Sequence, residues 1–186
     1  MNTEFEAKFI NINHEELLKS FESLDVVLEK SRTMFKRMTF DISNSPRGTF
    51  VRVRDEGGGK VTMTYKTVKE LSVTGTQEIE LEINDFDAAQ FFLLNIGLTQ
   101  ASYEENYRTF YKSGDIELTI DEWPGIPPYL EIEGSSKENV IAMAEKLNLL
   151  MDTALFGTAD EVYKHCGIDL SEFSKVTFES PPTVKS

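Results

Sequence analysis

Carboxylates that could bind a divalent metal ion recur at every second position in several segments of this sequence. Two-residue spacing places side chains on the same face of a β-strand. Like charges this close together repel each other unless a cation lies between them. Carboxylate oxygens suit Mg²⁺ or Mn²⁺. His14, His165 and Cys166, two of them adjacent, do not suit a zinc site, which needs four ligands in a tetrahedron. The acidic set is Glu4, Glu6, Glu78, Glu80, Asp121, Glu131 and Glu133.

Basic side chains occupy equivalent positions in other segments with the same alternation. Several Arg and Lys side chains that converge from separate strands are suited to a polyphosphate ligand. The whole chain is acidic, with 19 Lys and Arg against 32 Asp and Glu and a net charge of -13. We therefore expect no nucleic-acid partner and no membrane partner, because the long-range field repels phosphate. The basic set is Lys8, Arg52, Arg54, Lys66 and Arg108.

The elements that must position these side chains are mostly strands. Period-two alternation predicts eight of them, at 4–9, 35–41, 49–55, 60–66, 77–83, 103–112, 115–121 and 129–133. The run Asp55-Glu56-Gly57-Gly58-Gly59 predicts a hairpin turn. Because Val61 follows Lys60 where a phosphate-binding loop needs Ser or Thr, we reject that alternative.

Capping residues and apolar spacing predict four helices. The first runs from His14 to about Glu29 after an Asn13 cap. The second follows Asp85 and stops near Gly97. Capping boxes at Ser135 with Glu138, and at Thr158 with Glu161, predict helices at 137–147 and up to Gly167.

Two interpretations of the charged strand faces are open. In the first, the charges face solvent, as on many one-sided antiparallel sheets. In the second, the apolar faces turn outward to the four helices, and the charged faces enclose a channel or a charged ligand. The recurrence of Glu, which is depleted in strands, favours the second interpretation. We expect an α+β fold, a closed antiparallel β-barrel with helices outside, in one domain over 1–173. The tail 174–186, with Ser180-Pro181-Pro182, is expected to be flexible.

The order of these motifs resembles the CYTH domain, or triphosphate tunnel metalloenzyme, superfamily. Glu4-Phe5-Glu6-Ala7-Lys8 resembles its ExExK signature. The further matches are Arg52 and Arg54, Lys66, Glu78 and Glu80, Arg108, Asp121, and Glu131 and Glu133. The resemblance covers about residues 1–170 and implies an eight-stranded antiparallel tunnel that binds a triphosphate with one or two divalent metal ions, Mg²⁺ or Mn²⁺.

The resemblance also implies roles for individual residues. Glu4, Glu6 and Lys8 would form the catalytic set. Substrate phosphates would be held by Lys8, Arg52, Arg54, Lys66 and Arg108. The metal ligands would be Glu4, Glu6, Glu80, Asp121, Glu131 and Glu133. In one departure, Asn106 stands where the family often has a second basic residue, and Lys112 or Arg37 are the candidates to compensate.

Three functions remain open at this point. The first is metal-dependent hydrolysis of inorganic tripolyphosphate or of an organic or nucleoside triphosphate. The second is an adenylyl cyclase that makes cyclic AMP and diphosphate from ATP, and the third is a non-catalytic polyphosphate or nucleotide sensor. We favour the triphosphatase, because it needs only the features seen. One cysteine, no apolar run of about 20 residues and a charged N-terminus predict a cytoplasmic protein, either a monomer or a homodimer.

Overall fold

The computed structural model describes residues 2–46 and 48–185, and strand is the commonest secondary structure among them. The strands of the barrel are β1 (Asn2–Phe9), β2 (Val27–Asp41), β3 (Thr49–Asp55), β4 (Val61–Val68), β5 (Thr76–Ile83), β6 (Thr99–Ser113), β7 (Ile116–Glu122) and β8 (Tyr129–Gly134). The helices are α1 (His14–Ser23), α2 (Phe86–Asn95), α3 (Lys137–Lys146) and α4 (Ala159–His165), and two short 3-10 turns lie at Met151–Thr153 and Leu170–Glu172.

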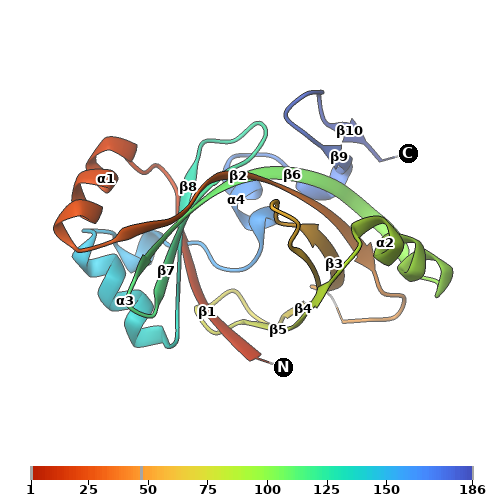
Figure 1. Ribbon diagram of the computed structural model, residues 1–186, viewed down its shortest axis with the longest axis horizontal. Helices are drawn as coiled ribbons and strands as arrows, with labels where there is room; N and C mark the ends of the chain where they lie inside the picture. Colours follow the sequence, from red (N-terminus) through yellow and green to blue (C-terminus); the bar gives the residue numbers. More distant parts are fainter. Residues whose placement is uncertain (1, 47, 186) are drawn as a thin grey trace.

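Eight of the strands close into a ring (Figure 1). Neighbouring strands follow the order β6-β2-β3-β4-β5-β1-β8-β7, and β7 pairs again with β6. Every pairing in this ring is antiparallel. The predicted closed, eight-stranded antiparallel barrel with helices outside is therefore confirmed.

The alternation of side chains gives the barrel a charged inside and an apolar outside. On the outer side, α1 and α3 cover β1, β7 and β8. Apolar residues of these strands, among them Phe9, Leu118 and Ile132, are fully buried beneath the helices. Helix α2 packs against the outer face of β3 and β4 around Val53 and Leu93. Because the apolar faces turn outward, the charged faces of the same strands turn inward.

A third apolar cluster holds α4 beside the barrel. It joins Trp123 and Tyr129 of the barrel wall to Val162 and Tyr163 of α4. The Tyr163 hydroxyl donates a hydrogen bond of 2.6 Å to the Pro124 carbonyl oxygen. This packing brings the segment before α4 against the interior of the barrel.

The first helix is shorter than its apolar pattern predicts. Helix α1 ends at Ser23, the chain turns at Asp25 in the left-handed region (φ 53°), and β2 begins at Val27. The β-branched Val26 and Val27 favour a strand, and the segment from Val27 pairs with β6. The predicted helix end at Glu29 is therefore wrong, and Leu28 is 57% exposed on the strand.

The other helix starts differ in detail from the predictions. Asn13 and Asp85 cap α1 and α2 through their side chains, as predicted. Helix α3 is capped by Ser136, whose hydroxyl accepts from the Asn139 amide, rather than by Ser135. Thr158 precedes α4 without capping a backbone amide, because its hydroxyl donates to the Asp160 carboxylate.

The β3–β4 hairpin turns as the sequence predicts. Gly57, Gly58 and Gly59 all have positive φ angles, between 65° and 88°. The Asp55 carboxylate accepts a hydrogen bond of 2.8 Å from the Gly57 amide and closes the turn. These three glycines serve the backbone conformation, because other residues rarely adopt positive φ angles. This agrees with the interpretation of the segment as a hairpin turn and not as a phosphate-binding loop.

The C-terminal residues add two short strands outside the ring. β9 (Phe173–Val176) pairs in parallel with β6, and β10 (Thr183–Val184) pairs with β9. Val176 and Thr177 are buried. The flexibility expected for 174–186 stays a prediction. No helix within residues 2–46 and 48–185 has the length and apolarity needed to cross a bilayer.

Candidate active site

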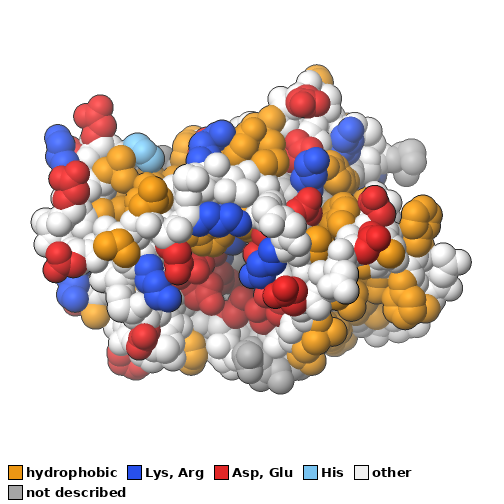
Figure 2. Space-filling view, viewed as in Figure 1, with side chains coloured by type: hydrophobic (Ala, Val, Ile, Leu, Met, Phe, Trp, Pro, Cys, Tyr) orange, Lys and Arg blue, Asp and Glu red, His pale blue; other side chains and the backbone are white. Residues whose placement is uncertain are grey.

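The interior of the barrel is a charged cavity of about 560 Å³. It is visible in Figure 2 as a hollow in which acidic and basic side chains gather. All the site residues predicted from the sequence line it, from seven different strands: Glu4, Glu6, Lys8, Arg52, Arg54, Lys66, Glu80, Arg108, Asp121, Glu131 and Glu133. The alternative in which these charges face bulk solvent on an open sheet is therefore excluded.

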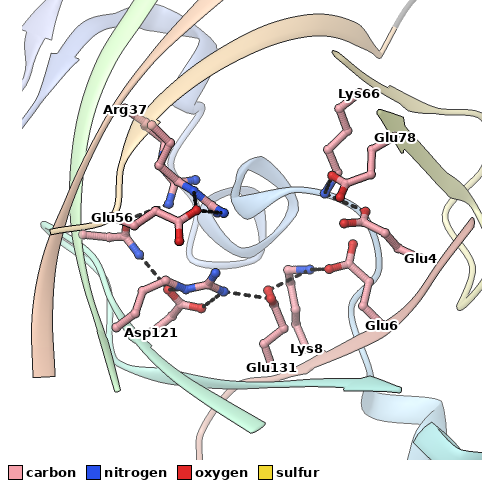
Figure 3. A network of polar contacts seen from close by, with 12 residues as sticks. Glu4, Glu6, Lys8, Arg37, Glu56, Lys66, Glu78, Asp121 and Glu131 are labelled. Carbon is pink, nitrogen blue, oxygen red and sulfur yellow. Dashed lines mark hydrogen bonds and ion pairs between the residues drawn. The ribbon is translucent and has the colours of Figure 1, made fainter. Parts of the chain in front are cut away.

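A continuous line of ion pairs runs along one wall of the cavity (Figure 3). Lys8 Nζ lies 2.8 Å from Glu6 Oε2 and 3.1 Å from Glu131 Oε2. Glu131 Oε1 in turn accepts from Arg108 Nη2 at 2.8 Å. Burial acts against the charge of Glu131, but Lys8 and Arg108 together hold its pKa well below its usual range. Glu131 is therefore ionised and fixed between two cations.

The same line continues from Arg108 to Arg37. Arg108 holds Asp121 with two hydrogen bonds, of 2.9 Å from Nε and 2.7 Å from Nη2. Asn106 Nδ2 donates at 2.7 Å to Asp121 Oδ1, the oxygen that also accepts from Arg108 Nε, and Asn106 Oδ1 accepts from Arg37 Nη2 at 2.6 Å. Asp121 and Asn106 are almost completely buried. This geometry fixes the direction of the Arg37 guanidinium.

The position of Arg37 resolves the choice left open by Asn106. Arg37 is buried and lines the cavity. Lys112 is half exposed, and its ammonium lies 3.9 Å from Glu29. Of the two candidates, only Arg37 brings a positive charge beside Asn106.

A cationic wall is formed by Arg37, Arg52 and Arg54. Arg37 and Arg54 are direct cross-strand partners of β2 and β3. Burial and then the positive charges of Arg54 and Arg37 lower the pKa of Arg52 to about 9. The facing carboxylate, Glu80, lies 3.9 Å from Arg52 and 3.7 Å from Arg54. The cationic wall therefore carries excess positive charge that an anionic ligand would stabilise.

Glu56 restrains the end of this wall. Its Oε1 accepts from Arg54 Nη2 at 2.6 Å, and its Oε2 lies 3.0 Å from Lys60 Nζ. Although burial opposes ionisation, these cations lower the pKa of Glu56 to about 2. Glu56 thus orients Arg54 from the β3–β4 turn.

A carboxylate row lies on the neighbouring strands β1, β8 and β7. Glu6 is the cross-strand partner of Glu133, and Glu133 is the partner of Glu117. Burial, followed by the negative charges of Glu131, Glu4 and Glu6, raises the pKa of Glu133 to about 8. Glu6 Oε1 is buried and has no hydrogen-bond partner. Oxygen donors crowded in this way are the environment that a hard divalent cation stabilises.

The carboxylate oxygens are therefore suitable ligands for a divalent ion, but they are not arranged as a complete coordination site. Among residues 2–46 and 48–185, no group of three or more His, Cys, Asp or Glu side chains is arranged to hold a metal ion. Several of the carboxylates are engaged by basic side chains instead, as in the pair between Glu4 and Lys66 at 2.7 Å. Metal binding at this row would have to compete with those pairs.

A separate acidic pair lies beside Lys66. The Lys66 ammonium lies 2.7 Å from Glu4 and 4.0 Å from Glu78. Burial acts first against ionisation of Glu4, but Lys66 holds its pKa below the usual value. Burial and the Glu4 charge raise the pKa of Glu78 to about 7. The Lys66 ammonium thus lies near two carboxylates. Its charge outweighs the effect of burial on the pKa of Glu4 but not on the pKa of Glu78.

The structure adds cavity residues that sequence reasoning did not assign to the site. They are Glu56, Glu104, Glu117 and Tyr129, and they lie beside Glu78 and Arg37, which the sequence named only as a strand match and as a possible compensating cation. Alternation alone signals Glu78 and Glu117, which share strand faces with Glu80 and Asp121. Glu56 directly follows β3, where period two continued from Arg54 places it on the same face. Glu104 is buried near Arg37, and burial raises its pKa.

The chain belongs to the CYTH domain family, whose family model matches residues 2–162. A curated relative from Methanocaldococcus jannaschii, named "putative adenylate cyclase", is 34% identical over 86 residues. That match covers 46% of this chain and 49% of the relative, so it spans about half of the relative's length. Members of this family are enzymes that act on triphosphates, as cyclases or triphosphatases, and generally use divalent metal ions.

Solved structures share the fold at low sequence identity. A Vibrio parahaemolyticus protein named "putative adenylate cyclase" matches with a TM-score of 0.74 and 16% identity, over 88% of this chain and 98% of that one. A Pyrococcus horikoshii protein matches at 0.70 and 22%, over 81% and 93%. A Hippeastrum protein, described as a "putative adenylyl cyclase" with a dominant triphosphatase activity, matches at 0.61 and 15%, over 90% and 97%.

Proposed function

We propose that this protein hydrolyses a triphosphate substrate inside the barrel cavity, with the help of Mg²⁺ or Mn²⁺. The observation that carries the proposal is the separation of charge within one cavity. The cationic wall of Arg37, Arg52 and Arg54 stands apart from the carboxylate row of Glu6, Glu133 and Glu117. A ligand that is itself polyanionic and binds cations satisfies both regions at once.

The basic residues bind and orient the phosphate chain. Arg52 and Arg54 present planar guanidinium groups that can form paired hydrogen bonds with phosphate oxygens. Lys66, Lys8 and Arg108 reach the same cavity from β4, β1 and β6. As negative charge grows on the leaving diphosphate, these fixed cations stabilise it without moving. In the reaction, a water oxygen bonds to the terminal phosphorus, and the bond from that phosphorus to the bridging oxygen breaks.

The acidic residues hold the divalent ion in this proposal. Mg²⁺ or Mn²⁺ would supply Lewis-acid polarisation of the phosphoryl group. Glu6 and Glu133 are best placed, because one has a free buried oxygen and the other lacks a compensating cation among the described ion pairs. Glu4, Glu80, Asp121 and Glu131 complete the proposed set, and each first has to leave or share its Lys or Arg partner.

Adenylyl cyclase activity is the second candidate function. The M. jannaschii relative favours it by name, and a cyclase would use the same phosphate and metal groups. A cyclase differs in its attacking group, which is the ribose 3'-hydroxyl. It also differs in the bond broken, which joins the α-phosphorus to the oxygen bridging the α- and β-phosphates. The Hippeastrum protein, named for a cyclase yet described by its triphosphatase activity, supports our preference for hydrolysis.

The single cysteine supports a cytoplasmic location in this proposal.

Product analysis separates the candidates. The protein is incubated with tripolyphosphate or with ATP, each with Mg²⁺ or Mn²⁺, and orthophosphate, diphosphate and cyclic AMP are quantified. A triphosphatase releases orthophosphate in equal amount to diphosphate or ADP. Cyclic AMP with equimolar diphosphate would establish the cyclase instead. Binding of both ligands without any product would establish a sensor, and Glu6→Gln serves as the control for contaminating phosphatases.

A further inference from the structure

A large apolar surface lies on the outside of the barrel, away from the cavity. Its members belong to β4, β5 and the end of α2, and all are at least partly open to solvent. We call this surface the outer apolar patch. It consists of Phe91 (68% exposed), Phe92 (60%), Ile96 (57%), Leu81 (53%), Ile79 (48%), Leu94 (42%) and Tyr65 (37%).

The strand and helix parts of the outer apolar patch are neighbours. Tyr65 and Ile79 are direct cross-strand partners, and Leu81 follows on the same face of β5. Ile83, next along this face, packs with Phe86 in the cluster beneath α2. The helix therefore begins where the strand part of the patch ends, and Figure 2 shows hydrophobic side chains gathered over the α2 end of the molecule.

Helix α2 has apolar residues on both of its faces. Asp87 is its single charged residue in the sequence FDAAQFFLLN. Leu93 is buried against the barrel, yet Phe91 and Phe92 are largely exposed. A helix that is apolar all round is normally buried all round. The barrel covers one face of α2, and the other face lacks a cover within this chain's described residues.

The size of the outer apolar patch matches what a stable dimer needs. With aromatic side chains at about 150–250 Å² each and aliphatic ones somewhat less, the exposed fractions correspond to roughly 700 Å². The largest patch of a typical monomer is about 300–600 Å², whereas one side of a standard interface buries about 800 Å². The patch alone therefore supplies most of one side of a protein interface.

We propose that two copies of this chain associate through the outer apolar patch about a two-fold axis, the commonest symmetry of homo-oligomers. The seven patch residues carry no charge, so two copies can meet there despite a net charge of -13 each. The same net charge opposes an anionic membrane as the occupant. Aromatic residues such as Phe91 and Phe92 are enriched in interface cores.

The two copies pack side chains against side chains and do not extend the sheet. Among the described residues, β1 pairs with β5 only as far as Glu78, which leaves the edge of 79–83 unpaired. Antiparallel pairing of two such edges about Leu81 would place Glu80 opposite Glu82 of the partner subunit. Like charges directly opposite each other are destabilising. Glu78 and Glu80 also face the cavity, so packing through the outer face leaves the cavity free.

The test measures molar mass by light scattering and sedimentation equilibrium from 1 to 100 µM. We expect wild-type protein to show twice the 21.1 kDa of one chain at the upper end. Phe91→Asp with Phe92→Asp should lower the association constant at least 100-fold. Leu150→Asp, a matched control at a residue that is 66% exposed outside the patch, should associate like wild type. A monomeric wild type at 100 µM would overturn the proposal, as would equal dimerisation of the double variant.

A second measurement uses the wild type alone, in case the double variant does not fold. Amide hydrogen exchange of residues 79–96 is compared at 1 and 100 µM. A dimer through the outer apolar patch predicts slower exchange there at the higher concentration, and no change in residues 147–153. Dimerisation with unchanged exchange over 79–96 would place the interface elsewhere and contradict the proposal.

Discussion

Arg37 donates a 2.6 Å hydrogen bond to the side-chain oxygen of Asn106, although the two residues are 69 positions apart in the sequence. The Asn106 amide is used on its other side by Asp121, at 2.7 Å. A neutral side chain thus joins a buried cation to a buried anion. The positive charge that position 106 lacks is supplied by the neighbouring strand β2.

We predict that Arg37→Met weakens tripolyphosphate binding by about 10- to 100-fold. The reason is the loss of a hydrogen bond to a charged group, worth about 1.5–3 kcal/mol, at about 1.4 kcal/mol for each tenfold change. Lys112→Met is the matched control, because that lysine is half exposed and pairs with Glu29. Calorimetric titration measures both. Equal affinities of the two variants for tripolyphosphate would show that Arg37 does not contribute to phosphate binding.

Glu6→Gln should lower triphosphate turnover by roughly 100-fold, near the loss seen when one key electrostatic group is removed. Chelation of divalent ions should abolish turnover in the wild type, and Mg²⁺ or Mn²⁺ should restore it. The variant should fold, because it removes one of several crowded carboxylates. Phosphate release and circular dichroism measure both properties. Undiminished turnover in a chelated enzyme would contradict the metal assignment.

The raised pKa of Glu133 predicts a pH dependence of stability in metal-free protein. Its pKa is about 8 in the fold against 4.5 for an ordinary, solvated glutamate side chain. The folded state therefore binds the proton more tightly, and the stability so gained is full below about pH 4.5 and lost as pH rises to about 8. Glu133→Gln removes this loss.

The measurement compares the melting temperatures of Glu133→Gln and wild type at pH 5 and pH 8, with a chelator present. We expect the variant to gain several degrees relative to wild type between these two pH values, at about 2–4 °C per kcal/mol. Glu82→Gln, on an open part of β5, is the control. An unchanged difference between pH 5 and pH 8 would show that Glu133 is not crowded by charge in solution.

The period-two pattern was sufficient to predict the barrel and the membership of its cavity. Once a strand's apolar face is outward, every second residue must point inward, so Glu4, Lys66 and Glu131 followed from the sequence alone. The end of α1 could not be predicted in this way. Leu24 and Leu28 continue a helical spacing, and the pairing of Val27 onward with β6 overrides it.

Cross-strand register explains what the sequence left open. The choice between Arg37 and Lys112 depended on which strands are neighbours and how they are aligned. Glu56 lies two residues after Arg54, just beyond the end of β3, so the strand predicted over 49–55 did not include it. The ion pairs within the cavity could not be predicted from the sequence either. Asp121, for example, was predicted as a metal ligand, and in the structure it pairs with Arg108.

A thermal shift series with monophosphate, diphosphate and tripolyphosphate tests the central claim most directly. It is run with Mg²⁺ at constant free concentration, on wild type and on Arg52→Ala with Arg54→Ala. One phosphate can meet only one or two of the separated cations, whereas a chain of three phosphates reaches several strands. A ligand at about 100 times its dissociation constant adds about 2.7 kcal/mol, a shift of about 5–11 °C at about 2–4 °C per kcal/mol. We predict that shift for tripolyphosphate, a much smaller one for monophosphate, and its loss in the double variant. Equal shifts for the three ligands, or an undiminished shift in the variant, would contradict triphosphate binding in the cavity.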